Sequence, residues 1–176
     1  LLAETVINDG GVVFGARFDS DWSVVHDFTE THEGLQAFRG SKYLQSRIGN
    51  TYRQAGKFLK AGRKVLFSGT PCQIAGLKRY LHKNYENLLA VDFVCHGVPS
   101  PLVWMKYLEE TIACQCEKNS VLLHSNPLIS ERDSMAGIRK RKIDAISFRN
   151  KNLGWKKFSF ALDYIPGERI YASFSS

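Results

Sequence analysis

The sequence predicts an α/β fold with a mixed, partly parallel sheet, flanking helices and an antiparallel β-hairpin portion. Apolar runs at 65–67 and 88–94 read as buried strands, and each leads through a turn into a helical pattern. Such an alternation of strands and helices implies right-handed crossovers and parallel pairing. Two further apolar runs, 12–16 and 23–28, are joined by the polar turn 19–21, which predicts an antiparallel pair.

The remaining elements follow from capping residues and apolar spacing. Glycine or proline marks most of their boundaries. The expected elements are a helix over Leu1–Ile7 that ends before Gly10, a short helix over Thr31–Phe38, a longer helix over Asn50–Ala61, a helix from Ser100 to about Ile112, and a hairpin of 161–164 and 170–171 around Pro166 and Gly167. Both ends look cut within an element, so we expect a fragment of a longer protein.

Length and composition suit one domain over 1–176, because 44% of the 176 residues are hydrophobic. Residues 114–141 lack sustained apolar periodicity and are expected to form a loop or insertion. No stretch has the length of a membrane span and no signal peptide is evident, so a cytoplasmic location without membrane contact is expected. The four cysteines are too few and too irregular for a disulfide scaffold and are interpreted as reduced thiols. The net charge of +7 implies attraction to anions without selecting among nucleotides, nucleic acid and acidic proteins.

The stretch KVLFSGTPCQIAGLKRYL, residues 64–81, predicts a strand, a turn and a helix. Thr70 is a good N-cap, Pro71 fits the first helical position, and Gln73 completes a capping box. Cys72 then lies in the first helical turn, where free N–H groups and the helix dipole favour a thiolate, a phosphate or another anion. A well-capped helix start with a small buried cysteine explains the same pattern equally well.

A second turn, Cys95–Ser100, follows the next expected strand. Sites in parallel sheets lie at the carboxyl ends of strands, so this turn should lie beside Gly69–Gln73. Three chemistries use such residues: a nucleophilic Cys–His pair, a metal or iron–sulfur site, and a cradle for a phosphate-bearing cofactor. The nucleophile lacks an evident orienting group and the metal site lacks paired C-x-x-C spacing, so no metal site is predicted and the cradle is favoured.

Several long segments, in order from Gly10 to about Phe160, carry a family resemblance. They are GGVVFGARFD, RGSKYLQSRIGNTYRQAGKFLKAGRKVLFSGTPCQIAGLKRYL, NLLAVDFVCHGVPSPLVWMKYLEE and ISFRNKNLGWKKFSF. The chain resembles the beta-subunit family of coenzyme F-420 (deazaflavin) hydrogenases and dehydrogenases. It is most similar to the bacterial branch often found beside polysaccharide-synthesis genes.

The resemblance implies an oxidoreductase module that binds FAD and passes electrons between iron–sulfur clusters, the flavin and a soluble hydride carrier. It identifies no catalytic residue. The cofactor-binding candidates are Ser41, Lys42, Tyr43, Gly69, Thr70, Pro71, Cys72, Gln73, Cys95, His96 and Gly97. The family's N-terminal ferredoxin-like segment, which would hold 4Fe–4S clusters, is not in this sequence, so the isolated fragment is expected to be inactive. The expected partner is a redox protein or a ferredoxin-like domain.

Two other functions fit parts of the sequence. One is a non-catalytic interaction module that keeps the fold and docks on an acidic partner. The other is nucleic-acid binding through the basic run 139–142, which is least favoured because no aromatic residues are interleaved with it. Cys114 and Cys116 are two residues apart, so on a helix they face different directions and are interpreted as structural.

Overall fold

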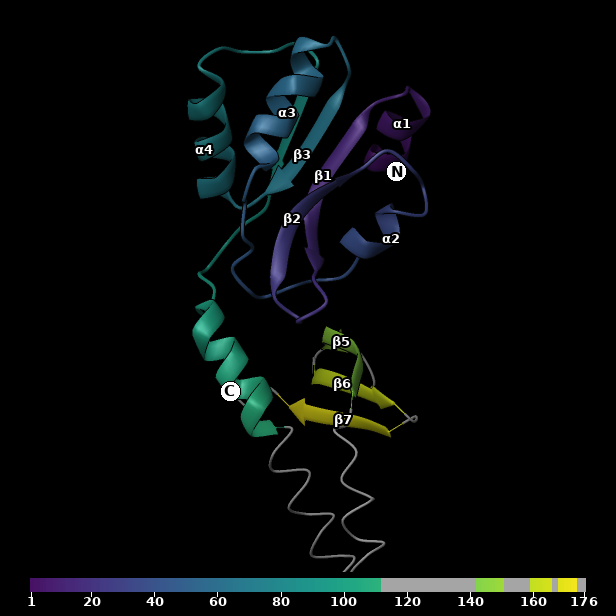
Figure 1. Cartoon of the computed structure of the whole chain (residues 1–176), viewed down its shortest axis with the longest axis vertical. Helices are drawn as coiled ribbons and strands as arrows, with labels where there is room; N and C mark the ends of the chain where they lie inside the picture. Colours follow the sequence, from purple (N-terminus) through teal and green to yellow (C-terminus); the bar gives the residue numbers. More distant parts are fainter. Residues whose placement is uncertain (112–141, 151–158, 166–167, 174–176) are drawn as a thin grey trace, which may run out of the picture. The chain divides into compact units, whose positions relative to one another are not determined.

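The computed structural model describes residues 1–111, 142–150, 159–165 and 168–173 (Figure 1). These residues form two compact units, Leu1–Pro99 and Ser100–Ser176, and each is considered by itself. The loop predicted at 114–141 lies outside the described residues. The assignment of the whole chain to one domain therefore stays a prediction.

The first unit is built on a four-stranded sheet in the order β2-β1-β3-β4. Its strands are β1 (Val12–Phe18), β2 (Val24–Thr29), β3 (Val65–Gly69) and β4 (Leu88–Asp92). β1 pairs with β2 antiparallel and with β3 parallel, and β3 pairs with β4 parallel. The mixed, partly parallel sheet predicted from the sequence is confirmed.

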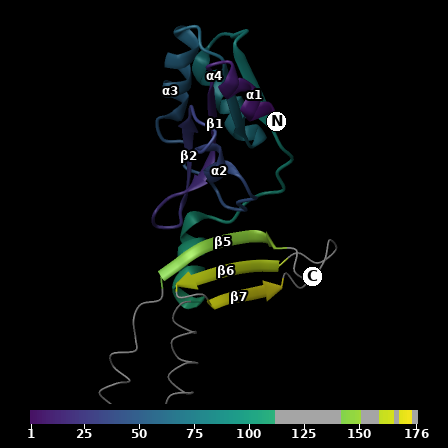
Figure 2. The ribbon, with the colours of Figure 1, turned by 90° about the vertical axis from the view of Figure 1, so that its right-hand side faces the viewer.

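Helices cover both faces of this sheet (Figures 1 and 2). They are α1 (Leu2–Asn8), α2 (Leu35–Phe38), α3 (Thr51–Lys60) and α4 (Pro71–Leu81). Alternate strand residues point to opposite faces, so the sheet has two apolar layers. One layer joins α3 and α4 to the sheet through Val12, Phe14, Ala55, Leu59, Val65, Phe67, Ile74 and Leu77. The other joins α1 and α2 through Val6, Ile7, Val13, Leu35 and Leu66.

The helix predicted over Thr31–Phe38 is shorter than expected, because α2 begins at Leu35. Threonine hydroxyls bond the turn that precedes it. Thr29 Oγ1 accepts the N–H of Thr31 at 3.2 Å, and Thr31 Oγ1 accepts the N–H of Gly34 at 3.2 Å. These local bonds stabilise a turn at residues that were expected to be helical.

The strand predicted over 88–94 also ends early, at Asp92. Its neighbour β3 ends at Gly69, which is paired with Asp92 in the register of the two strands. Beyond that point β4 has no strand to pair with, and Phe93 and Val94 are 56% and 81% exposed. The apolar run therefore continues past the end of the strand.

The second unit contains a three-stranded antiparallel sheet in the order β5-β6-β7. Its strands are β5 (Lys142–Asn150), β6 (Ser159–Ile165) and β7 (Glu168–Ser173). The hairpin predicted around 166–167 corresponds to β6 and β7 and is confirmed. A helix over 101–111 packs on this sheet, with Trp104 5.4 Å from Phe148 and 5.9 Å from Phe160 between ring centroids.

The core of the first unit gives a direct test of the fold. Leu77 of α4 is fully buried in the apolar layer between the sheet and the helices α3 and α4, whereas Leu89 of β4 is 43% exposed. We expect Leu77→Ala to lower the free energy of unfolding by about 2–5 kcal/mol through lost apolar burial and the cavity that remains. Leu89→Ala, the matched control, should lower it by less than half as much. Urea unfolding of both variants measures the difference, and equal losses would contradict the described packing.

Candidate functional site

The carboxyl ends of β3 and β4 lie at the same edge of the sheet. The two strands are parallel, and Gly69, the last residue of β3, is paired with Asp92, the last residue of β4. The turns that begin at Gly69 and after Asp92 therefore leave the sheet side by side. The expected pair of adjacent parallel strands that end at one edge is confirmed, and the position of Cys95–Ser100 beside Gly69–Gln73 stays a prediction.

The turn between β3 and α4 has the predicted capping box. Gln73 Oε1 accepts the backbone N–H of Thr70 at 3.0 Å, and Thr70 Oγ1 lies 3.1 Å from Cys72 Sγ. A Cβ on Gly69 would lie only 3.0 Å from Gln73 Oε1, so glycine lets the turn close. The Cys72 side chain is exposed in the first turn of α4. The interpretation of this residue as a small buried cysteine is therefore wrong.

Tyr52 of α3 holds the first turn of α4 from the side. Its hydroxyl donates to the carbonyl of Gln73 at 2.7 Å. Burial, with a smaller electrostatic contribution from Cys72, raises the pKa of Tyr52 above its ordinary value. The phenol thus remains a neutral donor beside the turn.

Beneath the turn lies a histidine that the sequence interpretation missed. His26 of β2 is only 6% exposed and stacks on Phe67 with ring centroids 5.3 Å apart. Its Nε2 lies 2.8 Å from the Ser68 carbonyl oxygen, and its Nδ1 lies 2.8 Å from Ser46 Oγ. Ser46 Oγ in turn accepts Nε2–H of Gln73 at 2.8 Å. These four residues, His26, Ser46, Ser68 and Gln73, form the serine–histidine network.

The network has one consistent assignment of donors. The Ser68 carbonyl can only accept, so His26 Nε2 carries the proton and Nδ1 of the neutral ring accepts from the Ser46 hydroxyl. Burial lowers the pKa of His26 below its ordinary value of 6.5, and the hydrogen bond to Ser68 opposes this effect more weakly. The ring is therefore neutral at pH 7.

Ser46 also connects the turn to the loop that follows α2. This loop carries Ser41, Lys42 and Tyr43, of which Lys42 is half-buried and the other two are exposed. Lys42 Nζ donates to the carbonyls of Arg39 at 3.0 Å and Gly40 at 3.3 Å. Burial lowers the pKa of Lys42 to about 8. Lys42 is thus a cation that loses its charge in mildly alkaline solution.

The second predicted turn is more open than the first. Cys95, His96 and Gly97 are exposed and belong to no helix or strand. Gly97 has φ +105°, a conformation that other residues rarely adopt, and a Cβ there would meet no atom within 4 Å. The described contacts do not join these three residues to the serine–histidine network.

Metal ligands do not gather in the described residues, where no group of three His, Cys, Asp or Glu side chains is placed to hold an ion. In the same part of the chain, no helix has the length and apolar character needed to cross a membrane.

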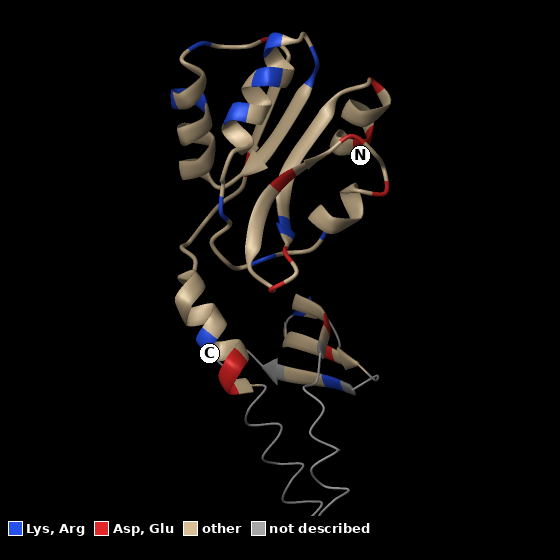
Figure 3. Ribbon diagram, in the orientation of Figure 1, with Lys and Arg blue, Asp and Glu red and all other residues tan. Residues whose placement is uncertain are grey.

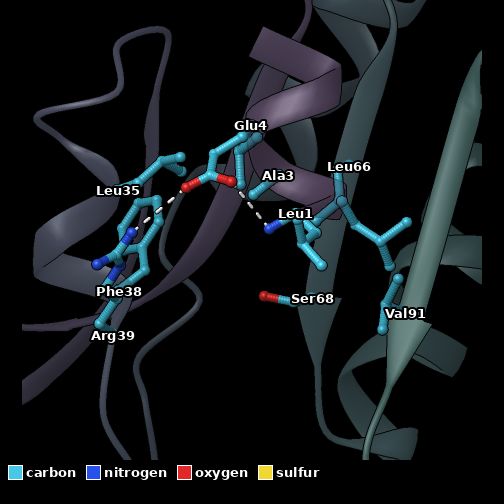
Figure 4. A pocket seen from close by; sticks show the side chains of 11 residues that line it. Leu1, Ala3, Glu4, Leu35, Phe38, Arg39, Leu66, Ser68 and Val91 are labelled. Carbon is cyan, nitrogen blue, oxygen red and sulfur yellow. Dashed lines mark hydrogen bonds and ion pairs between the residues drawn. The ribbon is translucent and has the colours of Figure 1, made fainter.

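A pocket of about 290 Å³ lies on the α1 and α2 side of the sheet (Figure 4). Val13, Leu35, Phe38 and Leu66 give it an apolar wall. Ser68 and Val91 also line it, and they directly precede Gly69 and Asp92 at the ends of β3 and β4. The pocket therefore reaches the edge from which both turns leave. None of the predicted cofactor-binding residues lines it.

The charged side chains at this pocket are Glu4 and Arg39. Arg39 Nη2 lies 3.4 Å from Glu4 Oε1, and Figure 4 shows this pair beside Phe38. Both side chains are partly or largely exposed, so the pair adds little to stability.

A known protein family matches the segment that forms this edge of the sheet. Residues 62–122, which include β3, α4 and β4, match the family model for the C terminus of the coenzyme F420 hydrogenase/dehydrogenase beta subunit. The predicted resemblance to the beta-subunit family is confirmed over this segment, and the narrower resemblance to its bacterial branch stays a prediction. The matched segment includes both turns of the candidate site.

A solved structure shows the same fold. A chain of the F420-reducing [NiFe] hydrogenase complex from Methanosarcina barkeri aligns with a TM-score of 0.55 at 12% sequence identity. The alignment covers 98% of this chain and 51% of that chain, so this chain spans about half the length of that one. No curated protein matches the sequence.

The lowered pKa of His26 predicts a pH dependence of stability. The unfolded chain takes up a proton near pH 6.5 and the native ring does so at lower pH, so acidification favours the unfolded state. We expect the urea midpoint to fall between pH 7.5 and pH 5.5, and to fall less in His26→Gln. His32→Gln, at an exposed histidine, should keep the wild-type fall. The same pH dependence in wild type and His26→Gln would show that His26 is not its source.

Proposed function

We propose that this chain is the flavin-binding part of an oxidoreductase that passes electrons between iron–sulfur clusters, FAD and a soluble hydride carrier. The observation that carries the proposal is the shared edge of β3 and β4, which lies in the segment that matches the beta-subunit family and which an apolar pocket reaches at Ser68 and Val91. The clusters would lie outside the described residues, in which no metal-binding group is found.

The residues at this edge suit a cofactor with an aromatic ring and a pyrophosphate. The pocket is close to the lower limit of small-molecule sites, about 300–1,000 Å³, so it suits a ring system and not the whole of FAD. The first turn of α4 offers backbone N–H groups and the positive end of the helix dipole to a phosphate. Lys42 supplies a cation on the loop tied to the turn through Ser46.

The protein's contribution would be binding and orientation. FAD, when bound, supplies the hydride and single-electron chemistry. Gln73 and Thr70 hold the start of α4 in place, while His26 and Ser46 hold Gln73. The aliphatic and aromatic wall of Leu35, Phe38 and Leu66 would exclude water from one side of a bound ring.

Protection of Cys72 tests this proposal. Cys72 is exposed in the absence of ligand. We expect saturating FAD to slow its alkylation by iodoacetamide at least about tenfold, because the cofactor would cover the first turn of α4. Mass spectrometry follows each cysteine separately, and Cys114 and Cys116 are expected to show no protection. Equal alkylation of Cys72 with and without FAD, together with no FAD retained on gel filtration, would contradict the proposal.

The role of Lys42 predicts a pH dependence of FAD binding. Burial lowers the pKa of Lys42 to about 8, so its positive charge is present at pH 7 and mostly lost at pH 9. We expect FAD affinity to fall between these pH values in the wild type and to be weaker but flatter in Lys42→Met. Lys64→Met, at a lysine paired with Asp9 at 2.8 Å, is the control and should keep the wild-type profile. Flavin fluorescence titration gives both affinities, and an unchanged profile in Lys42→Met would exclude this residue from the site.

A further inference from the structure

One part of the sequence carries positive charge without any compensating acid. Between Glu33 and Glu86 there is no Asp or Glu and there are eleven Lys or Arg residues. They are Arg39, Lys42, Arg47, Arg53, Lys57, Lys60, Arg63, Lys64, Lys78, Arg79 and Lys83. This segment contains α3, β3 and α4.

Four of these cations are paired with carboxylates from other segments. The pairs are Arg39–Glu4, Arg47–Asp19, Arg63–Glu30 and Lys64–Asp9. Lys42 is bonded to backbone carbonyls. The other six are exposed and have no carboxylate partner within the described ranges: Arg53, Lys57 and Lys60 of α3, Lys78 and Arg79 of α4, and Lys83 just after α4. We name these six the basic helix face.

The two helices that carry this face lie next to each other on the same side of the sheet. They share one apolar layer, and Tyr52 of α3 contacts Tyr80 of α4 with ring centroids 6.0 Å apart. Figure 3 shows blue bands along α3, blue in the last turn of α4, and no red on either helix. Tyr80, which follows Arg79 in α4, is 48% exposed and offers an aromatic contact beside the cations.

This arrangement is unfavourable for the helix itself. Arg53, Lys57 and Lys60 follow one another at spacings of four and three, so they lie on one stripe and repel each other. Arg53 lies in the first turn of α3, where the helix dipole disfavours a cation. A stripe selected only for solubility and stability would mix Glu with Lys. The basic helix face is therefore not explained by the stability of α3.

We propose that the basic helix face docks an acidic electron-carrier protein. This inference rests on the proposed function for the redox nature of the partner, and on the six cations without a described carboxylate partner for its charge. Complementary charge increases the rate of association and sets the orientation of transient complexes. Four of the six cations are lysines, which act as mobile point charges in a weak and reversible contact and lack the fixed bidentate geometry of arginine. Rapid exchange of a carrier needs such a contact.

A matched set of charge reversals tests the proposal on the full 176-residue chain. The probe is a plant-type [2Fe–2S] ferredoxin, a small acidic redox protein, and the readout is its Kd at 25, 50 and 100 mM NaCl. The variants are Arg53→Glu and the double variant Arg53→Glu/Arg79→Glu. Lys106→Glu is the control for Arg53→Glu. It makes the same change in net charge, but at an exposed lysine in the other unit.

We expect Arg53→Glu to weaken ferredoxin binding about threefold and the double variant at least about tenfold at 25 mM NaCl, with a smaller dependence on salt. Lys106→Glu should bind as the wild type does. Arg53→Glu places an acid in the first turn of α3, four residues before Lys57, so its urea midpoint should equal or exceed that of the wild type. Weaker binding by a protein that is at least as stable would assign the effect to docking and not to folding.

Three results would overturn the inference. They are no ferredoxin binding at 25 mM NaCl, equal losses in the double variant and Lys106→Glu, and tighter binding of a single-stranded DNA 20-mer that the same variants abolish. The last result would assign the face to nucleic acid. FAD titration of the wild type separates this proposal from the previous one: FAD binding without ferredoxin binding in the wild type would refute the docking face and leave the flavin site standing.

Discussion

The carbonyl oxygen of Ser68 can only accept a hydrogen bond, and the candidate site depends on this constraint. It fixes the proton on His26 Nε2, which leaves Nδ1 to accept from Ser46, which in turn accepts from Gln73. Gln73 Oε1 is thereby turned toward the N–H of Thr70. A single acceptor at the end of β3 thus sets the orientation of the side chain that caps α4.

The same network joins parts of the chain that are far apart in sequence. His26 comes from β2, Ser46 from the loop that carries Lys42, and Gln73 from α4. The network buries a polar imidazole ring, which would be unfavourable if the two ring nitrogens had no hydrogen-bond partners. Because both ring nitrogens are bonded, the ring stays neutral and rigid on Phe67. The start of α4 and the loop of Lys42 are consequently held as one body, which is the condition for binding a single cofactor.

Local chemistry made much of this predictable from the sequence, and long-range pairing made the rest inaccessible. The capping box of Thr70 and Gln73 follows from residues three apart, and the shared edge of β3 and β4 follows from the strand–helix–strand order. His26 was missed because its partners lie 20 and 42 residues away. One signal existed: His26 alternates with Val24 and Phe28, so it occupies an inward position of an apolar strand. The late start of α2 follows a turn held by threonine hydroxyls, and the early end of β4 follows from a missing neighbouring strand. Apolar periodicity reveals neither.

The same pair of helices in the first unit attracts anions in two different ways. At the start of α4 the attraction comes from backbone N–H groups and a dipole, which act over one turn and suit a phosphate held in a fixed place. Along α3 and at the end of α4 it comes from long, exposed side chains, which act over roughly 10 Å at moderate salt and suit a mobile partner. The first depends on hydrogen bonds that salt hardly screens, while the second weakens steeply with salt. Ionic strength should therefore release a docked carrier while a bound cofactor stays in place.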